Sequence, residues 1–179
     1  MKALVIGAFV RGLSMRDVES LCEQAGLGKL SKSTASRICE ELRDRFAAFK
    51  RRSLYDIRLV ALFLDATFIS VRPSGPKEGV LVAWGFTGAG ERVLLAVMLG
   101  MREAYEDWQA LGRDPIARGL AAPMLIVADG APGLTKAIDH CWPASDRQRC
   151  CVHRARNLYA KLPERERERV KHAYRHRAR

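Results

Sequence analysis

The spacing of apolar residues changes along the chain, from a helical period to a strand-like one. In the first fifty residues the apolar positions recur at steps of three and four, which puts them on one face of a helix. The two sets are Val18, Leu21, Cys22 and Ala25, and then Ala35, Ile38, Leu42, Phe46 and Phe49. Gly26 and Gly28 interrupt the pattern between the sets. Two short helices joined by a glycine-containing turn have the outline of a helix-turn-helix.

The middle of the chain consists of long apolar runs typical of strands. The stretches 57–71, 79–87 and 92–100 are rich in Leu, Val, Ile and Phe, and short links with Gly or Pro separate them. Three successive strands with short links predict an antiparallel meander. A helix follows from residue 103, and Pro115 indicates the start of another. A fourth strand at 123–130, which comes after a helix, is expected to lie parallel to an earlier strand.

The last third predicts a helix at 132–142, a short strand at 147–152 and a charged helical tail. The resulting order β-β-β-α-β-α-β-α is that of a ribonuclease H-like fold, in which the first strand is central and the fourth lies beside it. The predicted fold class is therefore α/β. A helical, helix-turn-helix-like region (residues 1–55) precedes the mixed sheet (56–152), and charged helices (153–179) follow it.

Charge is distributed unevenly along the chain, whose formal net charge is +11. Residues 1–55 carry +5, residues 56–146 carry −3, and residues 147–179 carry +9. Basic ends favour a polyanionic partner, most often nucleic acid. The alternative, a solvated helix surface, explains the basic tail equally well.

Several classes of protein are excluded by composition. No apolar run reaches the roughly eighteen residues that a membrane span needs, so no membrane partner is expected. The N-terminal stretch has no small-residue cleavage site after it, which argues against a signal peptide. The five cysteines are an odd number without framework spacing, which favours a reducing compartment. We therefore expect a cytoplasmic protein.

The start of the second helix carries short polar and basic side chains away from its apolar face. These candidate DNA-binding residues are Lys32, Ser33, Thr34 and Arg37. Side chains of this kind reach phosphates and base edges when a helix enters the major groove. The alternative is a plain helical hairpin, which is common and binds no DNA.

Two aspartates interrupt the apolar strands. Asp65 lies in the middle of the first strand, where a buried carboxylate without a partner would be costly. Asp129 ends the fourth strand and precedes a glycine, so an Asp-Gly turn is its alternative role. If these strands are neighbours, the two carboxylates converge at one sheet edge. They would then suit Mg²⁺ or Mn²⁺, which activates a water or a 3′-hydroxyl against a phosphodiester.

A third candidate is the C-x-x-H pair formed by Cys150 and His153. A zinc site needs four ligands, and no second pair with matching spacing is present. We therefore expect these residues to have a structural role, with the cysteine in a packed strand. Arg149, Arg154 and Arg156 lie beside them and would suit phosphates.

Phrases in order along the chain resemble the Mutator-type transposases of bacterial insertion sequences, which belong to the DDE superfamily. "RGLSMRDVESL" and "LSKSTASRI" resemble the N-terminal DNA-binding helices of that family. "LFLDATFISVR" and "LIVADGAPGLTKAI" resemble the strands with the first two catalytic aspartates, and "RQRCCVHRARNL" resembles the Cys/His block.

The resemblance implies that Asp65 and Asp129 are catalytic, metal-binding carboxylates that use Mg²⁺ (or Mn²⁺). It further implies that the complete enzyme cuts transposon ends, joins their 3′-hydroxyls to target DNA and acts as a homo-oligomer. The third acid of the family, a Glu, lies beyond a helical insertion that would begin near residue 153. Glu164, Glu166 and Glu168 do not match its context. We therefore expect a fragment, or, as the alternative, a non-catalytic DNA-binding remnant that occupies element ends.

Overall fold

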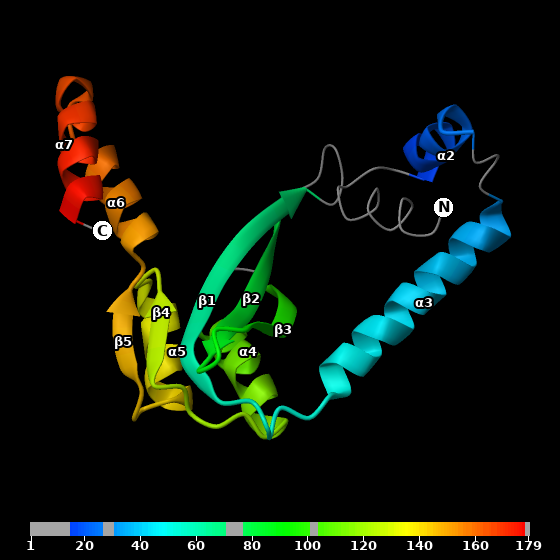
Figure 1. Cartoon of the computed structure of the whole chain (residues 1–179), viewed down its shortest axis with the longest axis horizontal. Helices are drawn as coiled ribbons and strands as arrows, with labels where there is room; N and C mark the ends of the chain where they lie inside the picture. The colour runs from blue at the N-terminus through cyan, green and yellow to red at the C-terminus, as the bar shows by residue number, and fades with distance from the viewer. Residues whose placement is uncertain (1–14, 27–30, 71–76, 101–103, 178–179) are drawn as a thin grey trace. The chain divides into compact units, whose positions relative to one another are not determined.

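The computed structural model describes residues 15–26, 31–70, 77–100 and 104–177. The chain divides into two compact units, Met1–Arg52 and Ser53–Arg179. Among the described residues, the first unit is helical and the second contains a sheet and four helices (Figure 1).

The first unit contains helices α2 (Met15–Gln24) and α3 (Lys32–Arg51), which confirms the two predicted helices. Ser31 caps α3, because its side-chain oxygen accepts a hydrogen bond from the Thr34 backbone N–H at 3.2 Å. Val18 of α2 and Ile38 of α3 are buried as expected. At the far end of the apolar face of α3, Phe46 stacks on Phe49 and is 46% exposed. Gly28 lies outside the described residues.

The second unit contains a five-stranded mixed sheet. β1 (Leu59–Ser70), β2 (Lys77–Thr87) and β3 (Arg92–Gly100) form the predicted antiparallel meander. β4 (Leu125–Ala128) pairs with β1 in parallel, and β5 (Asp146–Arg149) pairs with β4 in parallel. The order β3-β2-β1-β4-β5 places β1 centrally with β4 beside it (Figure 1). This topology confirms the ribonuclease H-like fold class.

Helix α4 (Tyr105–Ala117) is continuous, so the expectation of a new helix at Pro115 is wrong. Proline lacks a backbone N–H and clashes with the carbonyl four residues earlier, which is costly in a helix interior. Pro115 lies in the last turn, so only two helical residues follow the hydrogen bond that it removes. The carbonyl of Pro115 accepts from the Leu120 N–H at 3.0 Å, which helps to end the helix.

The boundary after β5 also differs from the prediction. The strand ends at Arg149, and helix α6 (Cys151–Ala160) begins where a strand to residue 152 was expected. The Cys150 N–H donates to the carbonyl of Ala128 at 2.7 Å, at the end of β4, and the chain then turns into the helix. Cys150 is therefore the residue before α6, not part of a packed strand. A short turn follows α6 and leads into α7 (Glu164–Arg177).

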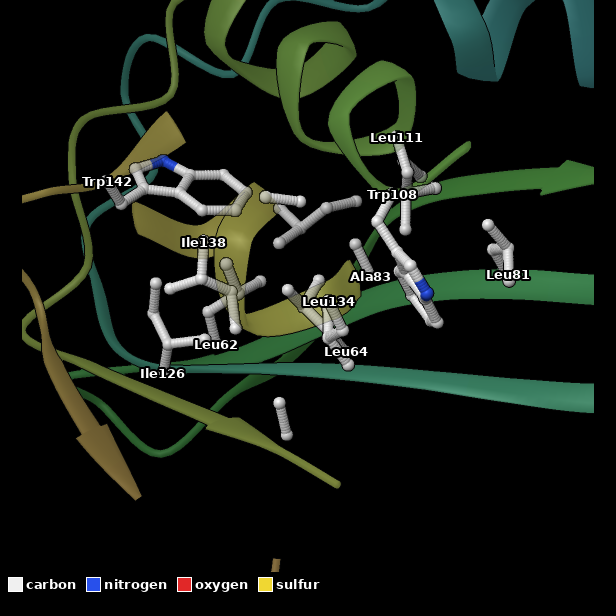
Figure 2. Packing of buried hydrophobic residues seen from close by; sticks show 14 of the residues in the cluster. Leu62, Leu64, Leu81, Ala83, Trp108, Leu111, Ile126, Leu134, Ile138 and Trp142 are labelled. Atoms are coloured by element: carbon white, nitrogen blue, oxygen red, sulfur yellow. The ribbon is translucent and has the colours of Figure 1, made fainter. Parts of the chain in front are cut away.

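One face of the sheet packs against α4 and α5 (Pro132–Cys141). Figure 2 shows side chains of the sheet pointing toward those of the helices. The strands contribute Leu62, Leu64, Leu81, Ala83 and Ile126, and the helices and their ends contribute Trp108, Leu111, Leu134, Ile138 and Trp142. Because side chains alternate along a strand, Phe63 and Asp65 lie on the opposite face. None of the described helices is both long enough and apolar enough to cross a membrane.

Candidate active site and nucleic-acid interface

Asp65 is exposed: 54% of its side chain is accessible, so the expectation that it is buried is wrong. The stretch around it is apolar at both odd and even positions, and apolarity alone therefore did not show which positions face the core. Asp65 lies on the face opposite Leu62 and Leu64. One of its oxygens, Oδ1, accepts a hydrogen bond from the Ala66 backbone N–H at 2.9 Å.

Asp129 directly follows β4 and forms a tight turn. Its Oδ1 accepts from the Ala131 backbone N–H at 2.8 Å, an Asx-type turn in which Gly130 has a φ of +88°. A positive φ of this size favours glycine. The alternative role given to Asp129, an Asp-Gly turn, is therefore present, and it occupies only one carboxylate oxygen.

The strand register relates the two aspartates. Phe63 of β1 is paired with Val127 of β4 in a parallel ladder. Asp65 lies two residues after Phe63 (65 − 63 = 2), and Asp129 lies two residues after Val127 (129 − 127 = 2). Each aspartate thus lies two residues beyond one member of the Phe63–Val127 pair, Asp65 within β1 and Asp129 just after the end of β4.

His153 borders Asp65 from the first turn of α6. Its Nε2 lies 3.9 Å from Asp65 Oδ1, and its Nδ1 is buried with no hydrogen-bond partner among the described residues. The two residues line a cavity of about 290 Å³ together with Trp84, Cys150 and Arg156, among others. The C-x-x-H motif therefore has a position beside a predicted metal-binding carboxylate.

No group of three or more metal-binding side chains gathers anywhere in the part of the chain that the structure describes. Cys150 makes no side-chain capping bond to α6. Its N–H donates to the Ala128 carbonyl and its own carbonyl accepts from the Arg154 N–H at 2.9 Å, so its backbone links the end of β4 to the first turn of the helix that carries His153. This arrangement is consistent with a structural role for Cys150, which stays a prediction.

The three arginines do not form one patch. Arg149 lies across the Asp129 turn, where its Nε donates to the carbonyl of Asp129 at 3.1 Å. Arg149 and Arg154 line a cleft of about 620 Å³ between α6 and α7, whereas Arg156 lines the cavity that contains Asp65. Residues two apart on a helix do not share a face, which separates Arg154 from Arg156.

An aromatic group near Asp65 was not predicted from the sequence. Phe63 and Trp84, which are paired across β1 and β2, stack with ring centroids 4.3 Å apart. Phe86 contacts both rings edge-on, and the Arg92 guanidinium lies 5.2 Å from the Trp84 ring centroid. The missing signal was the strand register, because the sequence does not say which residues of two strands are opposite each other.

The predicted DNA-binding residues of α3 lie at its start. Arg37 and Ser33 are exposed, and the hydroxyls of Ser33 and Thr34 each lie 2.9 Å from the Ser31 hydroxyl. These hydroxyls thus take part in the helix cap. The side chain of Lys32 lies outside the described residues.

Comparison with known proteins identifies the family. The sequence profile described as "Transposase, Mutator family" matches residues 1–177. The chain belongs to the Mutator family of transposases. It is 37% identical over 158 residues to the transposase for insertion sequence element IS6120 of Mycolicibacterium smegmatis, covering 87% of this chain and 49% of that protein. It is 36% identical over 165 residues to the transposase for insertion sequence element IS1081 of Mycobacterium tuberculosis, covering 91% and 40% respectively.

This Mutator-family chain thus spans less than half the length of these relatives. Among solved structures, the integrase catalytic core domain of HTLV-2, determined in complex with magnesium, is similar with a TM-score of 0.39 and 16% identity. That similarity covers 63% of this chain and 80% of the other. The family resemblance inferred from the sequence phrases is confirmed by the profile and by the relatives.

Two of the three glutamates of α7 form ion pairs within this helix of the Mutator-family chain. Glu166 pairs with Arg169 at 2.8 Å, and Glu168 pairs with Lys171. In each pair the two residues are three positions apart, a spacing that puts them on the same face of the helix.

Proposed function

We propose that this chain is the DNA-binding and partial catalytic portion of a transposase, which cuts the ends of an insertion element and joins the 3′-hydroxyls to target DNA. The observation that carries the proposal is the equal register of Asp65 and Asp129 on the parallel strands β1 and β4, in a chain of this family. The basic termini favour DNA as the partner. A cytoplasmic location and a homo-oligomeric full-length enzyme stay predictions.

The two carboxylates fit a hard divalent cation such as Mg²⁺ or Mn²⁺. Asp65 and Asp129 each use Oδ1 for a backbone N–H, and Oδ2 of each has no hydrogen bond among the described residues. Mg²⁺ is commonly held by one or two carboxylates, with waters and substrate phosphates completing its coordination. The bound cation supplies charge stabilisation of the phosphodiester and activation of the attacking oxygen.

The contribution of the chain itself is orientation. The backbone N–H groups of Ala66 and Ala131 each hold one carboxylate oxygen, which limits rotation of the side chains that would bind the cation. His153 lies against Asp65 and limits the space on that side. A fixed ligand orientation reduces the reorganisation that the reaction requires.

Cation binding by the whole chain tests this proposal. We expect Mn²⁺, followed by electron paramagnetic resonance, to bind weakly to the 179-residue protein. Asp65→Asn and Asp129→Asn should each reduce that binding, whereas Asp56→Asn, which alters an exposed aspartate outside the sheet, should not. Mn²⁺ binding that is unchanged in both site variants would contradict the metal site.

The helix-turn-helix-like region is proposed as a second contact with DNA. Replacing Lys32 and Arg37 together with Ala should weaken binding by roughly 1–3 kcal/mol, because such side chains contact bases or well-placed phosphates. The matched control is Arg43→Ala with Lys50→Ala, which removes the same charge from the later turns of α3. If the two double variants bind DNA with equal affinity in a mobility-shift titration, Lys32 and Arg37 are not specific DNA contacts.

The alternative function is a DNA-binding remnant without catalysis. Its support is that the described residues contain no group of three or more side chains placed to hold a metal ion. We expect the isolated chain to bind element ends without cutting them. Mg²⁺-dependent cleavage by the 179-residue chain that Asp129→Asn abolishes would exclude this alternative and establish an active enzyme.

A further inference from the structure

The cleft between α6 and α7 is lined by three cationic side chains and no acidic one. Arg149 comes from the end of β5, and Arg154 and Lys161 come from α6 and its C-terminal end. All three are exposed, and the structure gives Arg154 and Lys161 no acidic partner within the described ranges. Positive charge gathered in a hollow without neutralising carboxylates creates a positive potential that attracts an anion.

The walls of the cleft are held in place by contacts between the two helices. The Tyr174 hydroxyl of α7 donates to the carbonyl of Cys151 at 3.1 Å, and its ring contacts Tyr159 edge-on with centroids 6.3 Å apart. Asn157 adds an exposed amide to the lining, with both donor and acceptor atoms. At about 620 Å³, the cleft has room for more than one isolated phosphate group.

The cleft is linked directly to the proposed metal site. Arg149 uses Nε to hold the carbonyl of Asp129, and its two terminal amino groups stay available for an anion. A guanidinium binds phosphate through two parallel hydrogen bonds, so one arginine can contact the Asp129 turn and a phosphate together. An anion in the cleft thus lies next to the turn that presents Asp129.

We propose that the cleft lined by Arg149, Arg154 and Lys161 binds the phosphodiester backbone of a DNA strand and guides that strand past Asp129. This inference rests on the proposed function, because it takes DNA as the substrate of the Asp65–Asp129 site. It goes beyond that function by assigning the cleft between α6 and α7 to backbone contact. Arg156 lines the Asp65 cavity instead, so it is not among the residues proposed to contact the DNA backbone. Recognition here is by phosphate charge and carries no base preference.

Chemical protection of lysines in the wild-type chain tests the assignment without relying on a variant. The 179-residue protein is acetylated with and without a DNA duplex, and the modified lysines are identified by mass spectrometry. We expect DNA to protect Lys161 several-fold, while Lys136, an exposed residue of α5 that stacks on Tyr105, keeps its reactivity. DNA that binds and leaves Lys161 as reactive as Lys136 overturns the cleft assignment and leaves the proposed function standing.

Salt dependence of DNA affinity provides the second measurement. Arg154→Gln with Lys161→Gln should reduce the slope of log affinity against log salt by about 2, since each phosphate contact contributes roughly 0.9. The matched control, Arg165→Gln with Lys136→Gln, removes the same charge outside the cleft and should leave the slope nearly unchanged. Equal slopes in the two double variants overturn the proposal. No measurable DNA binding by the wild-type chain overturns the proposed DNA partner as well.

Discussion

Neighbouring residues of β1 have opposite environments. Leu64 is 5% exposed beneath the helices α4 and α5, whereas the side chain of Asp65 is 54% exposed on the other face of the sheet. The first face holds aliphatic side chains and two tryptophans at close packing. The second holds the aromatic group, His153 and the candidate metal ligand. The comparison teaches that one strand contributes to the packed core on one face and to the candidate site on the other, because its side chains alternate between the two faces.

The largest effect is expected on the packed face. Leu62 is fully buried, so Leu62→Ala should lower the free energy of unfolding by about 2–5 kcal/mol, through lost burial and the cavity left behind. Val60→Ala, in the same strand at a position that is 43% exposed, is the control and should cost less than about 1 kcal/mol. Urea denaturation measures both, and similar losses would contradict the two-face comparison.

A smaller effect is expected at the turn that presents Asp129. Gly130→Ala places a Cβ at a φ of +88° and 3.3 Å from Arg149 Nε, so it should cost roughly 1–3 kcal/mol. Gly88→Ala is the control, because Gly88 has an ordinary φ and its nearest neighbouring atom is at 4.0 Å. A Gly130→Ala variant as stable as the Gly88→Ala variant would show that the turn is not held as described.

Asp65→Asn should change stability by no more than about 0.5 kcal/mol, the range usual for exposed positions. Asparagine keeps the oxygen that accepts from Ala66, and the exposed side chain contributes little burial. Thermal unfolding of the variant without added cation measures the effect. A loss comparable to that of Leu62→Ala would mean that Asp65 has a packing role.

The smallest effect concerns cysteine reactivity. Burial raises the pKa of the Cys141 thiol, and the nearby Arg113 offsets this only in part. Less thiolate is then present at neutral pH, so alkylation of Cys141 should be slower than that of exposed Cys151. The alkylation rate of Cys141 should therefore keep rising with pH after the rate of Cys151 has levelled off. Mass spectrometry after timed alkylation distinguishes the two sites, and equal rates would contradict the burial of Cys141.

The sequence predicted the antiparallel meander because β1, β2 and β3 are long, mostly apolar runs between turn residues. It predicted β3 to the residue, since charge and glycine bound that run on both sides. It did not predict the exposure of Asp65, because both faces of β1 are apolar near that residue. The sequence also did not predict that α6 begins at Cys151, because the residue before it, Cys150, is not a typical helix-capping residue. Cross-strand partners such as Phe63 and Trp84 depend on register, which a single sequence does not contain.

The turn at Asp129 has a consequence for how a gene of this kind decays. A copy that no longer transposes is under no selection to keep a metal ligand, but its protein still needs an acceptor for the Ala131 N–H. Asparagine supplies that acceptor, and alanine does not. We therefore expect inactive copies that still produce a folded protein to drift from aspartate to asparagine at position 129 more readily than to alanine. A single amide at this position would then remove the proposed metal ligand while the fold survives.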